Sequence, residues 1–334
     1  MTERIDRAEL IGAWALDAVN ASDRDAVEAE LAADDGMRAH GDELRHVVAL
    51  LGEDLATAPP PSLRQSLLDS ARAIDRRRRL GAPSTPTEAY LHQADGANEA
   101  FSSVPDDAWH LQAKPYQWSL HGLVAHLLQI ERYFERTLGF TSSAPQPGEL
   151  DHLQLGADQI EAELQRSPRD TLADWRATVG RIAARLGEVD LDRPVQFHQW
   201  PFALRSLFVA RAFELWTHAD DTRRALGRPT VAPSAADSAV MSDASVGSLP
   251  LAIHVVTREV PNGRARVVLT GDGGGTWDLQ LGTGGGELVT IVADVVDYCR
   301  LAARRFEPET VPCTIDGDRD VALELLRAAT IIAV

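Results

Sequence analysis

Apolar residues recur every three or four positions along much of the chain, which is the spacing of amphipathic helices. The first such segment covers residues 8–55, where an N-cap sequence at Ser22 and a turn at 34–36 predict three helices. The prolines at 59–61 interrupt the pattern, and residues 62–79 predict one more amphipathic helix. Helices this short bury little surface by themselves, so the segment suits docking to a partner.

A second helical region follows residues 76–86, where arginines and then prolines predict a linker. Pro168 predicts a break in the third of its four long patterns, Pro201 is placed to open the fourth, and Gly227 to close it. Together the patterns predict a four-helix bundle with one long crossover. The four patterns cover residues 87–103, 119–138, 152–187 and 201–226.

The last part of the chain, from about residue 246, has shorter apolar segments separated by glycines. It predicts a small α/β domain with a hairpin turn at 271–275. The strands are expected over 251–256, 265–270, 276–281 and 311–316, and the helices over 293–305 and 318–329. The predicted fold is therefore multidomain and mainly α: a small helical domain over 1–75, a linker over 76–86, a bundle over 87–230 and an α/β domain over 246–334.

Composition narrows the class of protein. Hydrophobic residues make up 44% and charged residues 25%, as is ordinary for a globular protein. A formal net charge of −17 opposes direct binding to nucleic acid, because phosphates would be repelled. Two cysteines cannot build a disulfide framework or a four-cysteine zinc site. With no apparent signal peptide and no apolar run of roughly 18 residues, we expect a cytoplasmic protein that does not enter a membrane.

A candidate site lies in the fourth bundle pattern, where Arg211, Glu214, His218 and Asp221 fall within about 80° of one another on a helix surface. Glu214 and His218 are one turn apart, so a carboxylate and an imidazole can reach the same point. Asp221 is placed to orient the His218 ring, as carboxylates commonly do for metal-bound histidines. The alternative is a solvated helix face with ordinary charge pairs.

A third candidate ligand comes from the second bundle pattern, where His126 lies on the inward edge of the apolar arc and His121 faces outward. Glu131 falls inside the arc and needs a partner if it is buried. A lone histidine at such an edge is usually a packed core residue. Combined with Glu214 and His218, however, His126 completes a set of two imidazoles and one carboxylate that suits a divalent metal with open positions.

Several bundle motifs resemble the mycothiol-dependent maleylpyruvate isomerase family, within the wider DinB/YfiT-like group of metal-binding bundles. The first two motifs are Val-Pro-Asp-Asp-Ala-Trp at 104–109 and Val-Ala-His-Leu within the helical segment 118–128. The other two are Glu-x3-His-x2-Asp within 209–221 and Arg-Ala-Leu-Gly-Arg-Pro at 224–229. The resemblance implies metal ligands at His126, Glu214 and His218, with Asp221 supporting His218. It also implies mycothiol as the low-molecular-weight thiol, and a sterol-carrier-like fold for the C-terminal domain. We expect a divalent metal, with zinc the first choice.

Residues 10–19 and 26–31 resemble the N-terminal domain of actinobacterial anti-sigma factors. Members of that family carry a His-x3-Cys-x2-Cys zinc site, and this chain has Glu30, Asp34 and Met37 at those positions. No zinc is therefore expected there. The resemblance implies a sigma factor as a partner of residues 1–75, and the alternative is a small helical docking or dimerisation domain.

Three functions remain open at this point. The first is a mycothiol-dependent isomerase or thiol S-transferase, in which a metal-activated thiolate attacks the substrate and Arg211 attracts a substrate carboxylate or the thiolate. The second is a cytoplasmic anti-sigma factor, a transcription regulator whose bundle senses thiol or metal without catalysis. The third is a metal-free scaffold that keeps the bundle for dimerisation.

Overall fold

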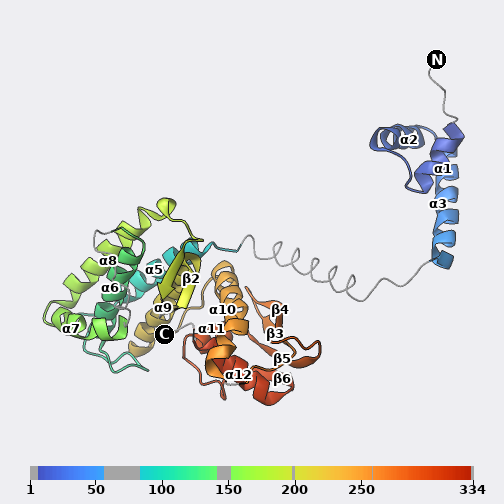
Figure 1. The fold of residues 1–334 in the computed structure, drawn as a ribbon. Helices are drawn as coiled ribbons and strands as arrows, with labels where there is room; N and C mark the ends of the chain where they lie inside the picture. Colours follow the sequence, from blue (N-terminus) through green and yellow to red (C-terminus); the bar gives the residue numbers. More distant parts are fainter. Residues whose placement is uncertain (1–6, 56–82, 141–151, 198–199, 258, 332–334) are drawn as a thin grey trace. The chain divides into compact units, whose positions relative to one another are not determined.

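A computed structural model of the protein describes residues 7–55, 83–140, 152–197, 200–257 and 259–331. The chain divides into two compact units, Met1–Ala73 and Ile74–Val334. Helices predominate in both units, and the sheets of the second unit are small (Figure 1). The prediction of a mainly helical protein with small sheets is thus confirmed, whereas the predicted helix over 62–79 lies outside the described residues.

The first unit contains α1 (Arg7–Ala15), α2 (Ala21–Ala33) and α3 (Asp35–Leu55), each of which packs against the other two. The cap of α2 differs from the expected Ser22, because the Asn20 side chain accepts the bond from the backbone of Asp23. The small core of this unit is formed by Ile11, Trp14, Val27 and Leu31.

Asp34 and Met37, two of the residues that stand in place of the His-x3-Cys-x2-Cys ligands, have structural roles. The Asp34 side chain accepts hydrogen bonds from the backbone N–H groups of Gly36 and Met37, so it caps the start of α3. Met37 is half-buried and packs against the small core. Both side chains thus contribute to the local structure of the first unit.

The second unit begins with a bundle in which α5 packs along α9 and α6 packs against α7 and α8. Tyr90, Phe134 and Phe208 meet edge to face in its core. Ser119 caps α6, and, as expected, α7 and α8 are separated just before Pro168. The elements are α5 (Pro86–Ser102), α6 (Leu120–Thr137), α7 (His152–Leu164), α8 (Pro168–Ala183), the 3₁₀ turn η1 (Leu186–Glu188) and α9 (Leu204–Ala225).

Two expectations for the bundle are wrong. His121 does not face outward: it is buried, and its Nε2 lies 3.0 Å from the Thr171 hydroxyl, because α7 and α8 cover the side of α6 opposite α9. Pro201 does not open α9. It lies in β2 (Trp200–Ala203), which pairs antiparallel with β1 (Pro194–Phe197), and α9 begins after this short hairpin.

The chain after the bundle starts with a long helix, α10 (Ala235–Val256), so the predicted strand over 251–256 is wrong. Leu249, Ala252 and Ile253 are buried at helical spacing, a pattern that a short apolar run does not distinguish from a strand. By length and composition α10 could cross a membrane, which is weak evidence by itself. Part of its apolar surface packs against α11, α12 and β4, whereas Leu251, Val255 and Val256 near its end are exposed.

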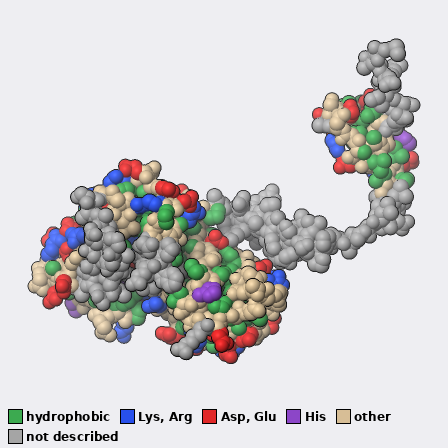
Figure 2. All heavy atoms as spheres, viewed as in Figure 1, with side chains coloured by type: hydrophobic (Ala, Val, Ile, Leu, Met, Phe, Trp, Pro, Cys, Tyr) green, Lys and Arg blue, Asp and Glu red, His purple; other side chains and the backbone are tan. Residues whose placement is uncertain are grey.

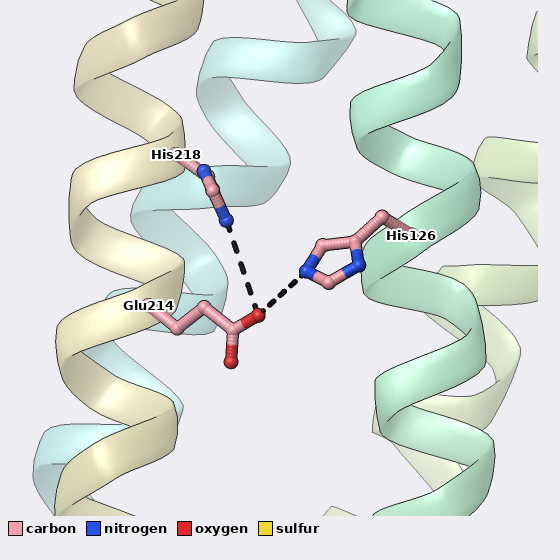
Figure 3. Close-up of side chains that lie close together, drawn as sticks. All are labelled: His126, Glu214 and His218. Atoms are coloured by element: carbon pink, nitrogen blue, oxygen red, sulfur yellow. Dashed lines mark hydrogen bonds and ion pairs between the residues drawn. The ribbon is translucent and has the colours of Figure 1, made fainter. Parts of the chain in front are cut away.

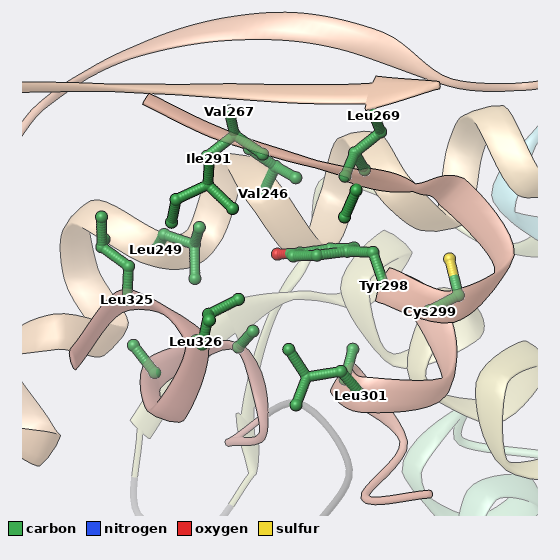
Figure 4. Close-up of a cluster of buried hydrophobic side chains, with 14 of the residues drawn as sticks. Val246, Leu249, Val267, Leu269, Ile291, Tyr298, Cys299, Leu301, Leu325 and Leu326 are labelled. Carbon is green, nitrogen blue, oxygen red and sulfur yellow. The ribbon is translucent and has the colours of Figure 1, made fainter. Parts of the chain in front are cut away.

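The sheet of this region has the order β4-β3-β5-β6. β3 (Arg264–Thr270) and β4 (Gly275–Gln280) form the expected hairpin, β5 (Glu287–Asp294) runs parallel to β3, and β6 (Cys313–Gly317) pairs antiparallel with β5. β5 lies where no strand was expected from the sequence. One core joins the sheet to α10, α11 (Val295–Ala302) and α12 (Arg319–Ala329), as Figure 4 shows.

A buried carboxylate fastens α10 to the bundle. Asp237, near the start of α10, accepts hydrogen bonds from the side chains of Ser84 and Gln93 at 2.6 and 3.0 Å. The His92 ring nitrogen Nδ1 lies 2.9 Å from the same carboxylate. The α/β region and the bundle are therefore held together by specific polar contacts as well as by apolar packing.

Two glycine substitutions test this packing. A Cβ added to Gly273, whose φ is +88°, would lie 2.5 Å from the Ala235 carbonyl oxygen and 2.6 Å from the Ser238 Cβ. We expect Gly273→Ala to lower the free energy of unfolding by about 1–3 kcal/mol. Gly247, inside α10, has nothing within 4 Å of an added Cβ, so Gly247→Ala should raise it by about 0.5–1 kcal/mol. Thermal and urea unfolding measure both, and equal effects of the two substitutions would contradict the packing described.

Candidate metal centre

Three side chains from two helices converge in the bundle. His126 comes from α6, and Glu214 and His218 come from successive turns of α9 (Figure 3). The His126 Nε2 lies 2.8 Å from Glu214 Oε1, and the His218 Nε2 lies 3.9 Å from the same oxygen. One donor atom from each residue lies within 4.8 Å of the other two. The three residues that the sequence singled out therefore share one centre.

The donor set fits a divalent cation. Zinc binds imidazole nitrogen and carboxylate oxygen at about 2.0–2.2 Å, which places the donors of a tetrahedral site roughly 3.4 Å apart. The distances of 2.8 and 3.9 Å bracket this value. Two imidazoles and one carboxylate also leave positions open on the cation for an outside ligand.

His218 is held in the form that binds a metal. Its Nδ1 lies 3.2 Å from Asp221 Oδ2, which assigns the proton to Nδ1 and leaves the Nε2 lone pair toward Glu214. Burial lowers the pKa of His218 despite the neighbouring carboxylates, so the ring is neutral at pH 7. Asp221 in turn pairs with Arg305, whose side chain is 4% exposed and whose Nε lies 3.2 Å from Asp221 Oδ1.

The Glu214 carboxylate is kept ionised. Burial would raise its pKa, but the positive charge of Arg211 and the hydrogen bond with His126 outweigh burial and hold the pKa below its usual range. Arg211 also pairs with Glu131, with 2.6 Å between Nη2 and Oε1. The Tyr90 hydroxyl donates to the other oxygen of Glu131 at 3.0 Å. A chain of buried polar contacts thus runs from α5 through α6 to the centre.

Two aromatic residues that precede α6 cover the histidines. Trp118 stacks on His126, with ring centroids 4.5 Å apart, and Tyr116 meets His218 edge-on at 5.4 Å. Tyr116 and Trp118 also stack on each other. These rings restrict how the imidazoles rotate, and they place apolar surface beside the candidate cation site.

The structure places the other predicted residues as follows. Asp221 contacts His218 as expected. Arg211 is 5% exposed, and its two terminal nitrogens contact Glu131 and Glu214, so it faces carboxylates of the chain itself. Glu131 has the partner that its place in the apolar arc required. Arg305 comes from outside the bundle, and its buried side chain pairs with Asp221.

Tyr116 and Trp118 are residues of the site that were not predicted from the sequence. They lie in the loop before α6, and no periodic pattern indicates where a loop side chain points. The only signal was the tryptophan directly before the Ser119 cap, a position from which it can fold back over the first turns of the helix.

Residues 91–223 match the family model described as the mycothiol maleylpyruvate isomerase N-terminal domain. Uncharacterized proteins of Mycobacterium tuberculosis, strains CDC 1551 / Oshkosh and ATCC 25618 / H37Rv, are each 25% identical over 234 residues, which cover 68% of this chain and 87% of theirs.

Two crystal structures of the mycothiol-dependent maleylpyruvate isomerase, one of them of a histidine-to-alanine mutant, align with 69% of this chain and 91% of theirs. The sequence identity is 13% and the TM-score is 0.46. The matched range 91–223 contains His126, Glu214 and His218. The family match thus supports a relationship between the region that carries the candidate metal centre and the mycothiol-dependent maleylpyruvate isomerases.

Proposed function

We propose that His126, Glu214 and His218 bind a divalent cation, with zinc as the first choice, and that the protein is a mycothiol-dependent isomerase or thiol S-transferase. The observation that carries this proposal is the convergence of the three donor atoms within 4.8 Å. The match of residues 91–223 to the isomerase domain supports mycothiol as the thiol. We place the protein in the cytoplasm, where a low-molecular-weight thiol is kept reduced.

A bound divalent cation lowers the pKa of a coordinated thiol, which makes the sulfur a nucleophile near neutral pH. The residues of the chain prepare this chemistry. Asp221 keeps the proton of His218 on Nδ1, which leaves Nε2 free to bind the cation. The Glu214 carboxylate supplies negative charge on the Nε2 side of this ring. Trp118 and Tyr116 hold the two imidazole rings and keep part of the surrounding surface apolar.

A second candidate function is regulation. We propose that residues 1–75 bind a sigma factor, and that the bundle then senses thiol or metal. The supporting observation is that Met1–Ala73 forms a compact unit of its own, with Leu16 and Val47 exposed on its surface. Co-purification of a sigma factor with the full chain, lost when residues 1–73 are deleted, together with no thiol-dependent turnover, would favour regulation over catalysis.

The metal proposal is tested by removing one ligand. His126→Ala should abolish stoichiometric zinc binding and any mycothiol-dependent turnover of maleylpyruvate, because two remaining donors hold a cation poorly. His110→Ala is the control, since His110 is exposed and outside the site. Elemental analysis and a turnover assay provide the readouts. If the wild-type protein carries no zinc after purification in a buffer that contains zinc, the result would instead favour the metal-free scaffold.

The role of Asp221 can be tested separately. Asp221→Asn removes the charge that holds the proton on His218 Nδ1, so metal affinity should fall by about 10–100-fold. Asp220→Asn is a matched control on the same helix, because the Asp220 carboxylate is buried and bonds to the Val231 backbone N–H. Competition with a chromophoric chelator measures both affinities. Equal losses in the two variants would show that Asp221 has no specific role in binding.

A further inference from the structure

Arg211 is buried between two carboxylates that have different surroundings. Its side chain is 6% exposed, whereas the side chain of Glu131 is completely buried and that of Glu214 is 26% exposed. One terminal nitrogen contacts Glu131, and the other contacts Glu214 Oε2. The third nitrogen, Nε, has no hydrogen-bond partner among the described residues, so the two carboxylates alone orient the guanidinium.

Glu131 anchors Arg211 in this position. Both oxygens of Glu131 are used, one by Arg211 at 2.6 Å and the other by the Tyr90 hydroxyl at 3.0 Å. If Arg211 moved away, a fully buried carboxylate would lose its counter-charge, and breaking a buried pair in this way is strongly unfavourable. The guanidinium therefore stays in place while other groups at the centre change.

The two oxygens of Glu214 consequently differ. Oε1 faces His126 Nε2 at 2.8 Å and His218 Nε2 at 3.9 Å, whereas Oε2 is contacted by Arg211. A carboxylate can bind a cation through one oxygen or through both. An oxygen held by a buried guanidinium is not free to turn toward the cation.

We propose that Arg211, anchored by Glu131 and Tyr90, is a positioning residue that makes Glu214 a one-oxygen metal ligand. This inference rests on the proposed metal site and goes beyond it, because it assigns how many positions on the cation remain open. Because Arg211 occupies Oε2, the chain supplies three donor atoms to the cation, one from each ligand residue. A Glu214 that bound through both oxygens would supply a fourth and leave one position fewer for the thiol and substrate. Arg211 thus acts on the outside ligands through Glu214 and does not contact them itself.

The test uses the full chain with cobalt(II) in place of zinc, because the absorption of cobalt reports its coordination number. Glu131→Gln combined with Arg211→Met removes the pair without leaving a buried unpaired charge. Arg211→Lys keeps the charge but loses the planar fork, so its single ammonium should remain with Glu131. In both variants we expect the second oxygen of Glu214 to take the position of an outside ligand, so that an added thiol gives a weaker sulfur-to-cobalt absorption band than it gives with the wild-type chain.

The control is Arg223→Met, since Arg223 lies on the same helix and pairs with the buried Asp220 away from the centre. This variant should keep the wild-type cobalt spectrum. A wild-type spectrum in both Arg211 variants would overturn the inference and leave the metal site standing. Failure of the wild-type chain to bind cobalt, or binding unaffected by His126→Ala, would overturn the proposed function together with the inference.

Discussion

The site is organised by the need to stabilise the negative charge of Glu214 inside a helical bundle. A carboxylate removed from water is costly unless opposite charge and hydrogen bonds compensate for it. Arg211 supplies the opposite charge, and two imidazoles supply polar contacts on the other oxygen. When Glu131 is also ionised, two carboxylates share one guanidinium, and one excess negative charge remains. A divalent cation at Oε1 would balance this charge and leave the centre positive enough to bind a thiolate.

A second set of buried contacts links the centre to the α/β region. Asp221 joins His218 of the bundle to Arg305, which follows α11. The position of Arg305 depends on α11, whose Tyr298 and Leu301 are fixed in the core shared with α10 and α12 (Figure 4). The orientation of one candidate metal ligand therefore depends on packing well outside the bundle. Unlike these buried pairs, which each have a defined partner, the acidic and basic side chains on the visible face of the second unit are simply interspersed (Figure 2).

Periodicity in the sequence was sufficient to predict the three candidate ligands, because a helix converts spacing directly into geometry. Glu214 and His218 are four residues apart on α9, and His126 lies on the edge of the apolar arc of α6 that meets this helix. The break before Pro168 was predictable for a similar reason, since a proline disrupts a helix within one turn of its own position.

Features that depend on a second neighbour or on a loop could not be predicted in this way. His121 was misplaced because a single apolar arc does not reveal that α7 and α8 cover the opposite side of α6. Residues 251–256 form the end of α10, since a six-residue apolar run fits a strand and a buried helix equally well. The Arg305–Asp221 contact joins residues that are 84 positions apart, and no local pattern indicates such a pairing.

The most direct measurement of the central claim is anomalous diffraction at the zinc absorption edge from crystals of the full chain grown with zinc. The account predicts one strong peak within about 2.0–2.2 Å of His126 Nε2, Glu214 Oε1 and His218 Nε2. A map without a peak between these three side chains, or with zinc bound only at surface carboxylates, would contradict it.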